Sequence, residues 1–407
     1  MNGAGAGQGQ YGAPPPAPVL PPPAGRSRQG GAAFTVLVSV AMLLGAGVMA
    51  LVLLGSGAPG ALVVGTLLAA LPVGPLVACF LWLDRYEPEP RGLILLALGW
   101  GALVATAAAL VLQLVGQFAF DRPETFTAAI SAPVSEEAVK GLFVVLLLVA
   151  RRHEIDGVLD GIVYAGMVGI GFAFTENILY LAAAYMGGDG AGPGGIEGAT
   201  GTFVVRGVFS PFAHPFFTAA TGIGVGVAVV TRSRFWRVAA PLLGYSVAVL
   251  CHALWNGTAY FDGGQLFLLT YLFLMVPAFL LTAGFAVWAS TREGRMLARA
   301  LTDAADRGFL ARHEVPWLVR VAGRRAARSH ARAQGGAPAL RVMREYQQQA
   351  IELGFLHDRY LRGTAPADFA RRGQAKVERM AVLRPHVVFP TAAGTTWTTQ
   401  PRREGGR

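Results

Sequence analysis

Long apolar runs follow one another closely between residues 34 and 289 of the chain. Eight of these runs are long enough to cross the hydrocarbon core of a bilayer, which takes about 20 consecutive apolar residues in a helix. They lie at approximately residues 34–55, 61–83, 92–116, 126–150, 157–186, 203–230, 238–259 and 265–289. The pattern predicts an all-α fold, a polytopic membrane bundle of about eight transmembrane helices.

The segments that flank the predicted bundle differ from it in composition. Residues 1–33 are rich in Pro, Gly and Gln, which predicts a disordered arm with no signal peptide. Residues 290–390 are rich in Arg and carry apolar residues at helical spacing, which predicts a small helical tail domain. Residues 391–407 are expected to form a disordered end.

The loops between the runs alternate in charge. Basic residues occur before the first run and after the second, fourth, sixth and eighth runs, whereas the other loops carry only Arg122. Because basic loops tend to remain in the cytoplasm, both termini are predicted to be cytoplasmic, in a multi-pass protein of the plasma membrane. An odd number of spans would break this alternation.

Overall composition supports a membrane protein. Only 14% of the residues are charged, whereas a soluble domain has roughly 25%. The net charge of +10 does not indicate a nucleic-acid partner, because most basic residues lie in the tail or in short loops. We expect the basic tail to lie near anionic lipid headgroups, with a specific partner site as the alternative. Cys79 and Cys251 lie within apolar runs and do not indicate an extracellular disulfide framework.

Polar side chains interrupt four consecutive runs. An ionisable group at the bilayer centre costs at least about 2.5–3.5 kcal/mol, so such groups usually mark a functional site. With a rise of about 1.5 Å per residue, their depths agree within roughly 6 Å, in the outer half of the membrane. The residues are Glu136, Glu137 and Lys140, then Glu176 and Asn177, then His214, and finally His252 and Asn256. We predict that four helices enclose one polar site. Asp160 and Arg206 lie near span ends and are interpreted as positional.

Helical geometry suggests roles for the residues of the fourth run. Glu136 and Lys140 are four residues apart and share a face, whereas Glu137 points about 100° away from Glu136. One glutamate is therefore expected to pair with Lys140 while the other faces the cavity, as a general base acting on water. The structural alternatives are a Glu–Lys pair and histidines that only hold helices together.

Several short motifs around these residues resemble the PrsW family of intramembrane proteases. That family is related to the CAAX-processing prenyl-protein proteases and to the anterior-pharynx-defective scaffold subunit of gamma-secretase. The resemblance covers roughly residues 70–290. Its motifs are an early loop at 84–88, Glu-Glu-x-x-Lys at 136–140, Phe-x-x-x-Glu-Asn at 172–177, His-Pro with a Gly-rich stretch at 214–226, and His-x-x-x-Asn at 252–256.

The resemblance implies hydrolysis of a peptide bond in a membrane-embedded or membrane-proximal protein, and a regulatory substrate such as an anti-sigma factor. It implies that Glu136 and Glu137 hold the activating base. Glu176, His214 and His252 would complete the catalytic site, with Lys140, Asn177 and Asn256 in supporting roles and Asn256 as a donor to the oxyanion.

The same resemblance leaves the use of a metal open. His214, His252 and Glu176 are compatible with Zn²⁺, which accepts imidazole nitrogen and carboxylate oxygen. The chain lacks the His-Glu-x-x-His helix motif, so a metal-free mechanism fits equally well.

Two other functions compete with proteolysis. A non-catalytic scaffold would bind a partner helix in the same polar cavity, because a shared fold does not guarantee activity. A proton- or ion-coupled transporter is the weaker alternative, because the polar groups cluster at one depth and no inverted repeat is evident.

Overall fold

The computed structural model describes residues 28–121, 123–187, 193–259 and 264–390. Within these ranges the regular structure consists of helices only, and most of each predicted run is helical. The first 27 residues of the predicted arm and the predicted end at 391–407 lie outside the described residues. The arm's last six residues, 28–33, already belong to the first helix.

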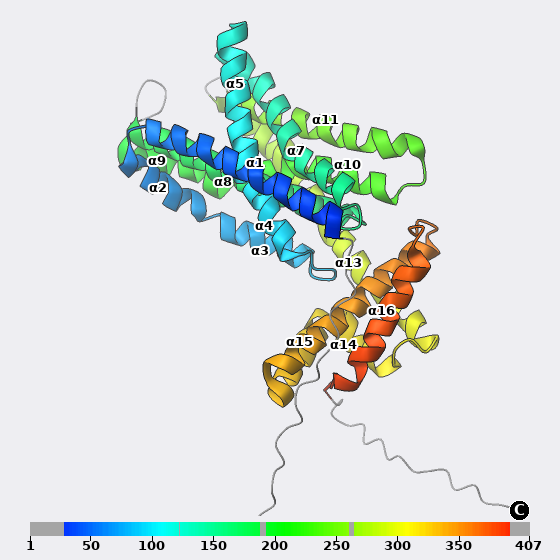
Figure 1. Ribbon diagram of the computed structural model, residues 1–407. Helices are drawn as coiled ribbons and strands as arrows, with labels where there is room; N and C mark the ends of the chain where they lie inside the picture. The colour runs from blue at the N-terminus through cyan, green and yellow to red at the C-terminus, as the bar shows by residue number, and fades with distance from the viewer. Residues whose placement is uncertain (1–27, 122, 188–192, 260–263, 391–407) are drawn as a thin grey trace, which may run out of the picture.

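The membrane part of the chain is built from long helices, several of which are joined through short π-helical segments (Figure 1). The elements are α1 (Arg28–Gly55), α2 (Pro59–Ala70), α3 (Val73–Leu83), α4 (Arg91–Gly99), η1 (Trp100–Ala105), α5 (Thr106–Phe120), α6 (Glu124–Phe126), η2 (Thr127–Ser131), α7 (Ala132–Ala150), α8 (Val158–Met186), α9 (Gly195–Phe203), η3 (Val204–Phe209), α10 (Ala213–Val230), α11 (Arg234–Thr258), α12 (Gln265–Thr270), η5 (Tyr271–Met275) and α13 (Val276–Asp306).

Seven helical segments of the described chain are long and apolar enough to cross a membrane. They correspond to seven of the eight predicted runs, so the predicted all-α polytopic membrane bundle is confirmed. The remaining run, the fourth at 126–150, contains α7, whose 19 residues include Glu136, Glu137 and Lys140. These three charged residues distinguish α7 from the seven segments, although it packs among them.

Two helix boundaries differ from the predicted ones. α9 begins at Gly195, within the predicted loop at 187–202, so the sixth run is preceded by two further helical turns. α13 continues to Asp306 and crosses the expected domain boundary at residue 289, because nothing between the apolar run and the Arg-rich tail ends the helix.

Helix α8 lies at the centre of the bundle. Of the residues in its most apolar 18-residue stretch, 89% are buried. It packs most extensively against α10. The two backbones meet at Gly161 and Gly222, where a Cβ atom on either residue would lie 2.1 Å from the carbonyl oxygen of the other. Only glycine permits this approach, which brings the polar residues of α8 and α10 close together.

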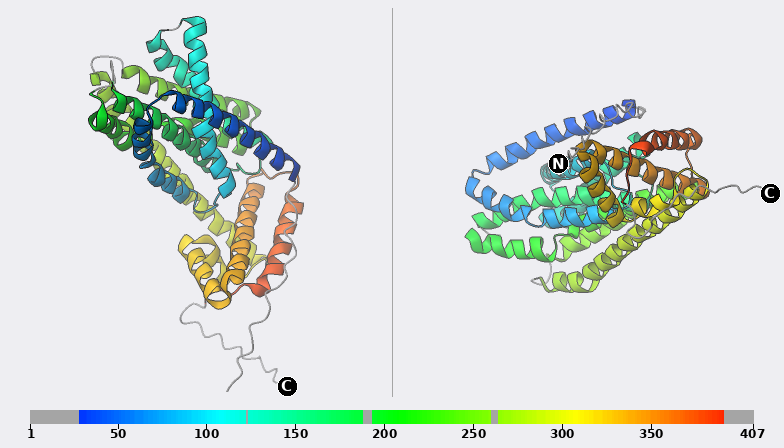
Figure 2. Two further views of the ribbon diagram at one scale, coloured as in Figure 1. Left: turned by 60° about the vertical axis from the view of Figure 1, so that its left-hand side comes forward. Right: turned by 90° about the horizontal axis from the view of Figure 1, so that it is seen from below.

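The tail forms a second core below the bundle (Figure 1, Figure 2). Its elements are η6 (Arg312–Glu314), α14 (Val315–Val319), α15 (Val321–Leu361), α16 (Phe369–Leu383) and η7 (Arg384–His386). α15 is bent at Gly335 and Gly336, whose backbones are not helical. Leu297 and Leu301 of α13 belong to the tail core, so one continuous helix joins the tail to the bundle.

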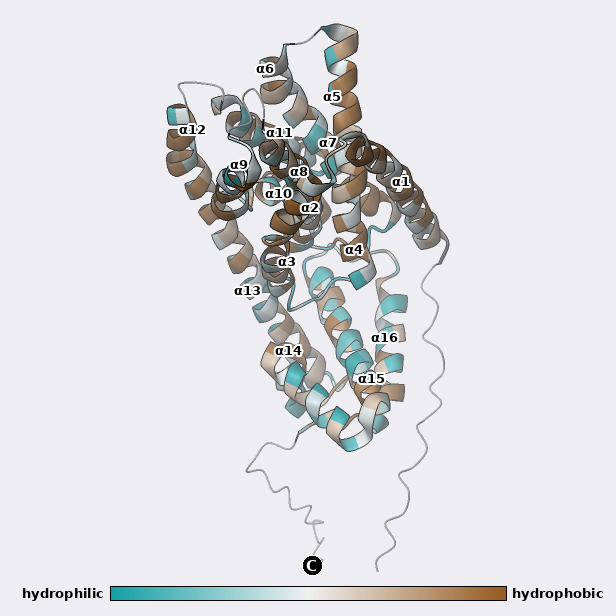
Figure 3. Cartoon of the chain, turned by 90° about the vertical axis from the view of Figure 1, so that its left-hand side faces the viewer, coloured by the Kyte–Doolittle hydropathy of each residue, from teal (hydrophilic) through white to brown (hydrophobic). Residues whose placement is uncertain are grey.

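Polar contacts fix the tail against the loop between α3 and α4. Arg324 of α15 donates to the carbonyl oxygens of Arg85 and Tyr86, the latter at 3.0 Å, and the Ser290 hydroxyl donates to the Leu83 carbonyl at 2.7 Å. This junction coincides with the change from the apolar bundle to the polar tail in Figure 3. The loop thus serves as the docking point of the tail.

Candidate active site

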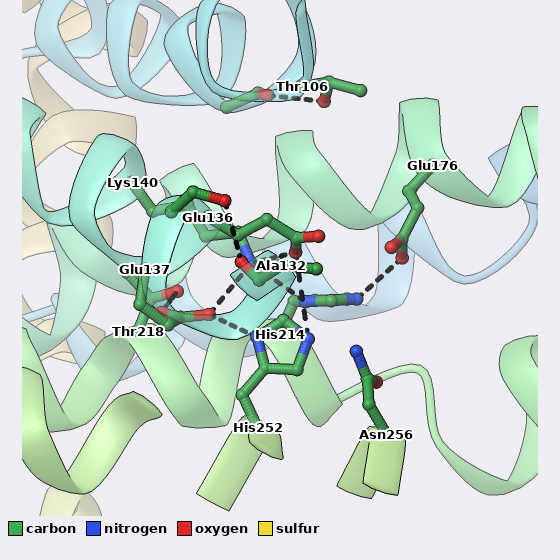
Figure 4. Close-up of polar contacts among 12 residues, drawn as sticks. Thr106, Ala132, Glu136, Glu137, Lys140, Glu176, His214, Thr218, His252 and Asn256 are labelled. Carbon is green, nitrogen blue, oxygen red and sulfur yellow. Dashed lines mark hydrogen bonds and ion pairs between the residues drawn. The ribbon is translucent and has the colours of Figure 1, made fainter. Parts of the chain in front are cut away.

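The predicted site residues converge from four helices in the bundle interior (Figure 4). α7 contributes Glu136, Glu137 and Lys140, α8 contributes Glu176 and Asn177, α10 contributes His214, and α11 contributes His252 and Asn256. Glu137 and Lys140 are completely buried, and Glu136, His214 and His252 expose 6% of their surface or less. Residues that are far apart in sequence therefore form one enclosed polar cluster.

Lys140 is the centre of this cluster. Its ammonium group lies 2.9 Å from Glu137 Oε1, 3.3 Å from Glu136 Oε2 and 3.0 Å from His214 Nδ1. It also lies 3.7 Å from the centre of the Phe172 ring. The prediction that one glutamate pairs with Lys140 while the other faces the cavity is wrong in its first part, because Lys140 pairs with both. A lysine side chain is long enough to reach both the i−3 and the i−4 carboxylate.

Glu137 holds His252 in a defined orientation. Its Oε1 lies 3.0 Å from His252 Nδ1, and its Oε2 accepts a hydrogen bond of 2.9 Å from the Thr218 hydroxyl. Because an ionised carboxylate only accepts hydrogen bonds, His252 Nδ1 carries the hydrogen. In the neutral imidazole the other ring nitrogen, Nε2, presents its lone pair to Glu136 Oε2, 3.7 Å away.

His214 is also held at the ring nitrogen that does not contact Lys140. Its Nε2 lies 2.7 Å from Glu176 Oε2, and Arg206 forms an ion pair with the same carboxylate. Arg206 also donates to Asn177 Oδ1 at 2.7 Å. Arg206, interpreted from the sequence as positional, therefore connects Glu176 and Asn177 to the cluster.

Sequence reasoning missed two further members of the network. Gln113 of α5 donates to Glu136 Oε1 at 3.1 Å, and Thr218 binds Glu137 as described above. Both left a signal in the sequence. Gln113 is a lone strongly polar residue near the end of an apolar run, and Thr218 follows His214 by four residues, on the same helix face.

Asn256 lies at the edge of the cluster. Its amide nitrogen donates to the Ala128 carbonyl at 3.0 Å, which ties α11 to the π-helical segment before α7. This contact uses one of its two amide hydrogens.

Aromatic rings fix both imidazoles in place. Phe217 stacks on His252 with 5.0 Å between ring centroids, and Phe172 packs against His214 at 5.1 Å. The two imidazoles meet edge to face at 5.0 Å. Contacts on several sides of each ring leave little rotational freedom, so the site is rigid and preorganised.

Comparison with known proteins connects this geometry to a family. Residues 89–282 match the family model described as PrsW family intramembrane metalloprotease, a range that contains all the clustered residues. The Protease PrsW of Geobacillus kaustophilus is 31% identical over 170 residues, which cover 41% of this chain and 69% of that protein. The chain belongs to the PrsW family of intramembrane proteases.

Two further relatives agree with this assignment. The Protease PrsW of Oceanobacillus iheyensis is 27% identical over 177 residues, covering 44% of this chain and 74% of that protein. The Protease PrsW of Bacillus subtilis is 29% identical over 106 residues, covering 26% of this chain and 48% of that protein. No solved structure gives a significant match. The tail domain lies outside the family match.

The PrsW family is described as metalloproteases, and the described residues contain one group with suitable geometry. Glu136, His214 and His252 can each offer one ligand atom, and these atoms all lie within 4.8 Å of one another. Two imidazoles and a carboxylate are a donor set that zinc accepts. This group contains Glu136 where the sequence suggested Glu176, which is instead bonded to His214 and Arg206.

A small cavity adjoins this PrsW-family site. It has a volume of about 10 Å³, roughly enough for one water molecule. Its walls are formed by Ala173, Asn177, Arg206, Ser210, Pro211, Ala213, His214 and Trp255. The structure thus shows a closed site, with Arg206 and His214 among the residues that line the small space beside it.

Proposed function

We propose that this protein hydrolyses peptide bonds of a membrane-embedded or membrane-proximal protein, with Glu136 and His252 as the groups that bind and activate water. One observation carries the proposal. Glu136 Oε2 and His252 Nε2 are two hydrogen-bond acceptors that face each other across 3.7 Å. A water molecule beside them that donates one hydrogen to each would satisfy both acceptors and turn its oxygen lone pairs outward.

The proton of the attacking water would go to Glu136. Gln113 and Lys140 hold the two oxygens of this carboxylate, so it is fixed in orientation. When the water oxygen adds to the scissile carbonyl, Glu136 takes the proton. It then returns the proton to the leaving amine nitrogen as the carbon–nitrogen bond breaks.

Other residues would stabilise the charge that develops on the carbonyl oxygen. The Lys140 ammonium supplies a buried positive charge in a medium of low dielectric, where charge–charge interactions are strong. Asn256 retains one amide hydrogen beyond its bond to Ala128 and can donate it to the oxyanion. Glu137 keeps its role of orienting His252 throughout.

The donor set also fits zinc, which Glu136, His214 and His252 would hold. Glu136 and His252 would then be metal ligands in place of the groups that bind the water. Such an ion would polarise the carbonyl and activate water. In that arrangement Glu137 and Thr218 would orient His252 from behind, as carboxylates commonly do for metal-bound histidines.

A peptide requires more space than the closed site offers. The cavity of about 10 Å³ next to His214 holds no backbone segment, so helices must separate before the substrate binds. The pair of Arg206 and Glu176 connects η3 to α8 beside this cavity. We therefore place the opening between these two elements. A single-span regulatory protein such as an anti-sigma factor is the substrate that the family resemblance favours.

A single-turnover cleavage assay tests the proposal. Purified protein in lipid is mixed with a panel of single-span membrane peptides, and products are identified by mass spectrometry. The Glu136→Gln plus Glu137→Gln variant should yield no product, whereas Glu197→Gln, an exposed change of the same type, should cleave like the wild type. Equal cleavage by all three proteins would refute the proposal. A chelator added to the wild type then tests the zinc requirement.

The complete burial of Glu137 and Lys140 favours one second candidate, a scaffold that binds a partner helix without catalysis. A scaffold would retain its partner in cells, cleave nothing, and lose the partner in the double variant. Cleavage that depends on Glu136 and Glu137 would exclude this candidate.

A further inference from the structure

Lysine is rare in this chain. Of its 34 lysine and arginine residues only two are lysines, Lys140 and Lys376. Lys140 is the one that lies completely buried at the centre of the site. An ammonium group is a compact charge with three donors, whereas guanidinium is a planar fork that binds carboxylates side on. The surroundings of Lys140 match the ammonium, because Glu136, Glu137 and His214 each present one acceptor to it.

The contact between Lys140 and His214 fixes the state of the imidazole. A protonated lysine only donates hydrogen bonds, so His214 Nδ1 must present a lone pair to it. The ring hydrogen is then on Nε2, where Glu176 accepts it at 2.7 Å. His214 therefore has one nitrogen lone pair available, and Lys140 already uses it.

That lone pair is also the one a metal ion would need. Zinc binds imidazole nitrogen at about 2.0–2.1 Å and carboxylate oxygen at about 2.0–2.2 Å. Lys140 Nζ lies 3.0 Å from His214 Nδ1 and 3.3 Å from Glu136 Oε2. It thus holds two of the three candidate ligands, and one lone pair on Nδ1 cannot serve both an ammonium hydrogen and a metal.

We propose that Lys140 is a tethered cation that competes with the metal ion for His214 and Glu136. This inference rests on the proposed metal site of Glu136, His214 and His252. With Lys140 in place, Glu136 and Glu137 already share one positive charge without a metal. Metal binding requires Lys140 to withdraw toward Glu137, and the side chain therefore sets the affinity of the site for metal.

Zinc affinity of the purified full chain, measured by competition with a chelator of known affinity, tests this idea. Removing the competitor in Lys140→Met should tighten zinc binding by about tenfold or more, because like charges about 4 Å apart repel strongly in a buried site. Lys140→Met alone leaves Glu137 without its charge partner and could fail to fold. The variant Lys140→Met plus Glu137→Gln restores the charge balance and keeps an acceptor for His252.

Both variants retain all three candidate ligands, and Glu137→Gln alone is the reference for the charge-balanced variant, because the two share the change at Glu137. Tighter zinc binding in the charge-balanced variant, lost again when His214→Ala is added, would support the proposal. Equal zinc affinity in Glu137→Gln and the charge-balanced variant would overturn it. Failure of every variant to bind zinc would overturn both this inference and the zinc site, while glutamate-dependent cleavage by the wild type would still support the protease.

Discussion

Arg206 has a larger role in the site than its position near a span end predicts. It joins Glu176 and Asn177 of α8 to the same membrane helix that carries His214, and its guanidinium lies 4.0 Å from the centre of the Tyr180 ring. A charge placed inside the bilayer is expensive unless it is paired. Arg206 and Glu176 neutralise each other and fix the ring hydrogen of His214 on Nε2.

Loss of the Arg206 side chain should therefore weaken catalysis, although it leaves the water-binding groups Glu136 and His252 unchanged. We expect Arg206→Gln to lower kcat by roughly 10- to 100-fold with little change in KM, because outer partners of this kind orient catalytic histidines. Cleavage kinetics of the purified protein provide the measurement. Arg234→Gln, at an exposed arginine of α11, is the matched control and should be unaffected. A normal kcat in Arg206→Gln would contradict the assigned role.

At the scale of elements, close contact between α8 and α10 is a precondition of the site. The contact places Glu176 and His214 on facing helices, and it depends on Gly161 and Gly222. Neither glycine has a side chain that could join the polar cluster, so the contact acts by setting the distance between the helices. The site therefore depends on small residues that carry no chemistry.

A methyl group at this contact should destabilise the bundle. In Gly161→Ala the new Cβ atom would meet the Gly222 carbonyl oxygen at 2.1 Å, so the helices must separate. We expect a loss of about 1–3 kcal/mol or more in the free energy of unfolding, as for overpacked cores. Thermal unfolding in detergent measures it. Gly47→Ala, where nothing lies within 4 Å of the added Cβ, should be neutral or stabilising.

The loop between α3 and α4 is a second element with a specific role. Asp84 begins it, and burial raises the pKa of Asp84 from 3.8 to about 8, against a hydrogen bond of 2.8 Å from the Glu89 amide. Burial also raises the pKa values of Glu87 and Glu89 in the same loop. Burial in the loop that docks the tail therefore favours the protonated forms of these carboxyl groups in the folded state.

This shift makes the stability of the protein depend on pH. Between about pH 4 and pH 8 the folded state holds a proton on Asp84 that the unfolded state has lost, so stability falls as pH rises. We expect the melting temperature to decrease from pH 5 to pH 8, and Asp84→Asn to reduce this decrease.

The half-exposed Asp303 is a suitable comparison for this experiment. Its hydrogen bond from Arg307 lowers its pKa, so its contribution has the opposite sign. Asp303→Asn should leave the decrease between pH 5 and pH 8 intact. A slope that is the same in Asp84→Asn and in the wild type would contradict a role for Asp84.

At the scale of the whole molecule, α7 decides the number of membrane crossings. Seven segments qualify by length and apolarity, and α7 becomes the eighth only if a helix with three ionisable residues also crosses. Its charges are buried against other helices of the bundle, not exposed to lipid. We therefore expect α7 to cross, because lipid meets only its apolar side.

Eight crossings place both termini on the same side of the membrane. Fluorescent protein fused to either end should be fluorescent in a bacterial host, since both ends are predicted to be cytoplasmic. A periplasmic reporter such as alkaline phosphatase inserted near Glu197, between α8 and η3, should be active. Termini on opposite sides would indicate seven crossings and would contradict the predicted role of α7.

Sequence alone determined the fold class and most members of the cluster. Apolar runs of sufficient length require membrane helices, because the backbone must satisfy its own hydrogen bonds in lipid. Charged residues within such runs are too costly to be incidental, so Glu136, Glu176, His214 and His252 were identifiable from their depth alone.

Tertiary structure decided how these groups are paired. Periodicity gives the face of a helix but not its rotation against three neighbours, so it could not show that Lys140 binds both glutamates and His214. For the same reason it could not place Glu136, in preference to Glu176, beside both histidines. Such choices depend on differences of a few ångströms between side chains from separate helices, and only packing fixes them.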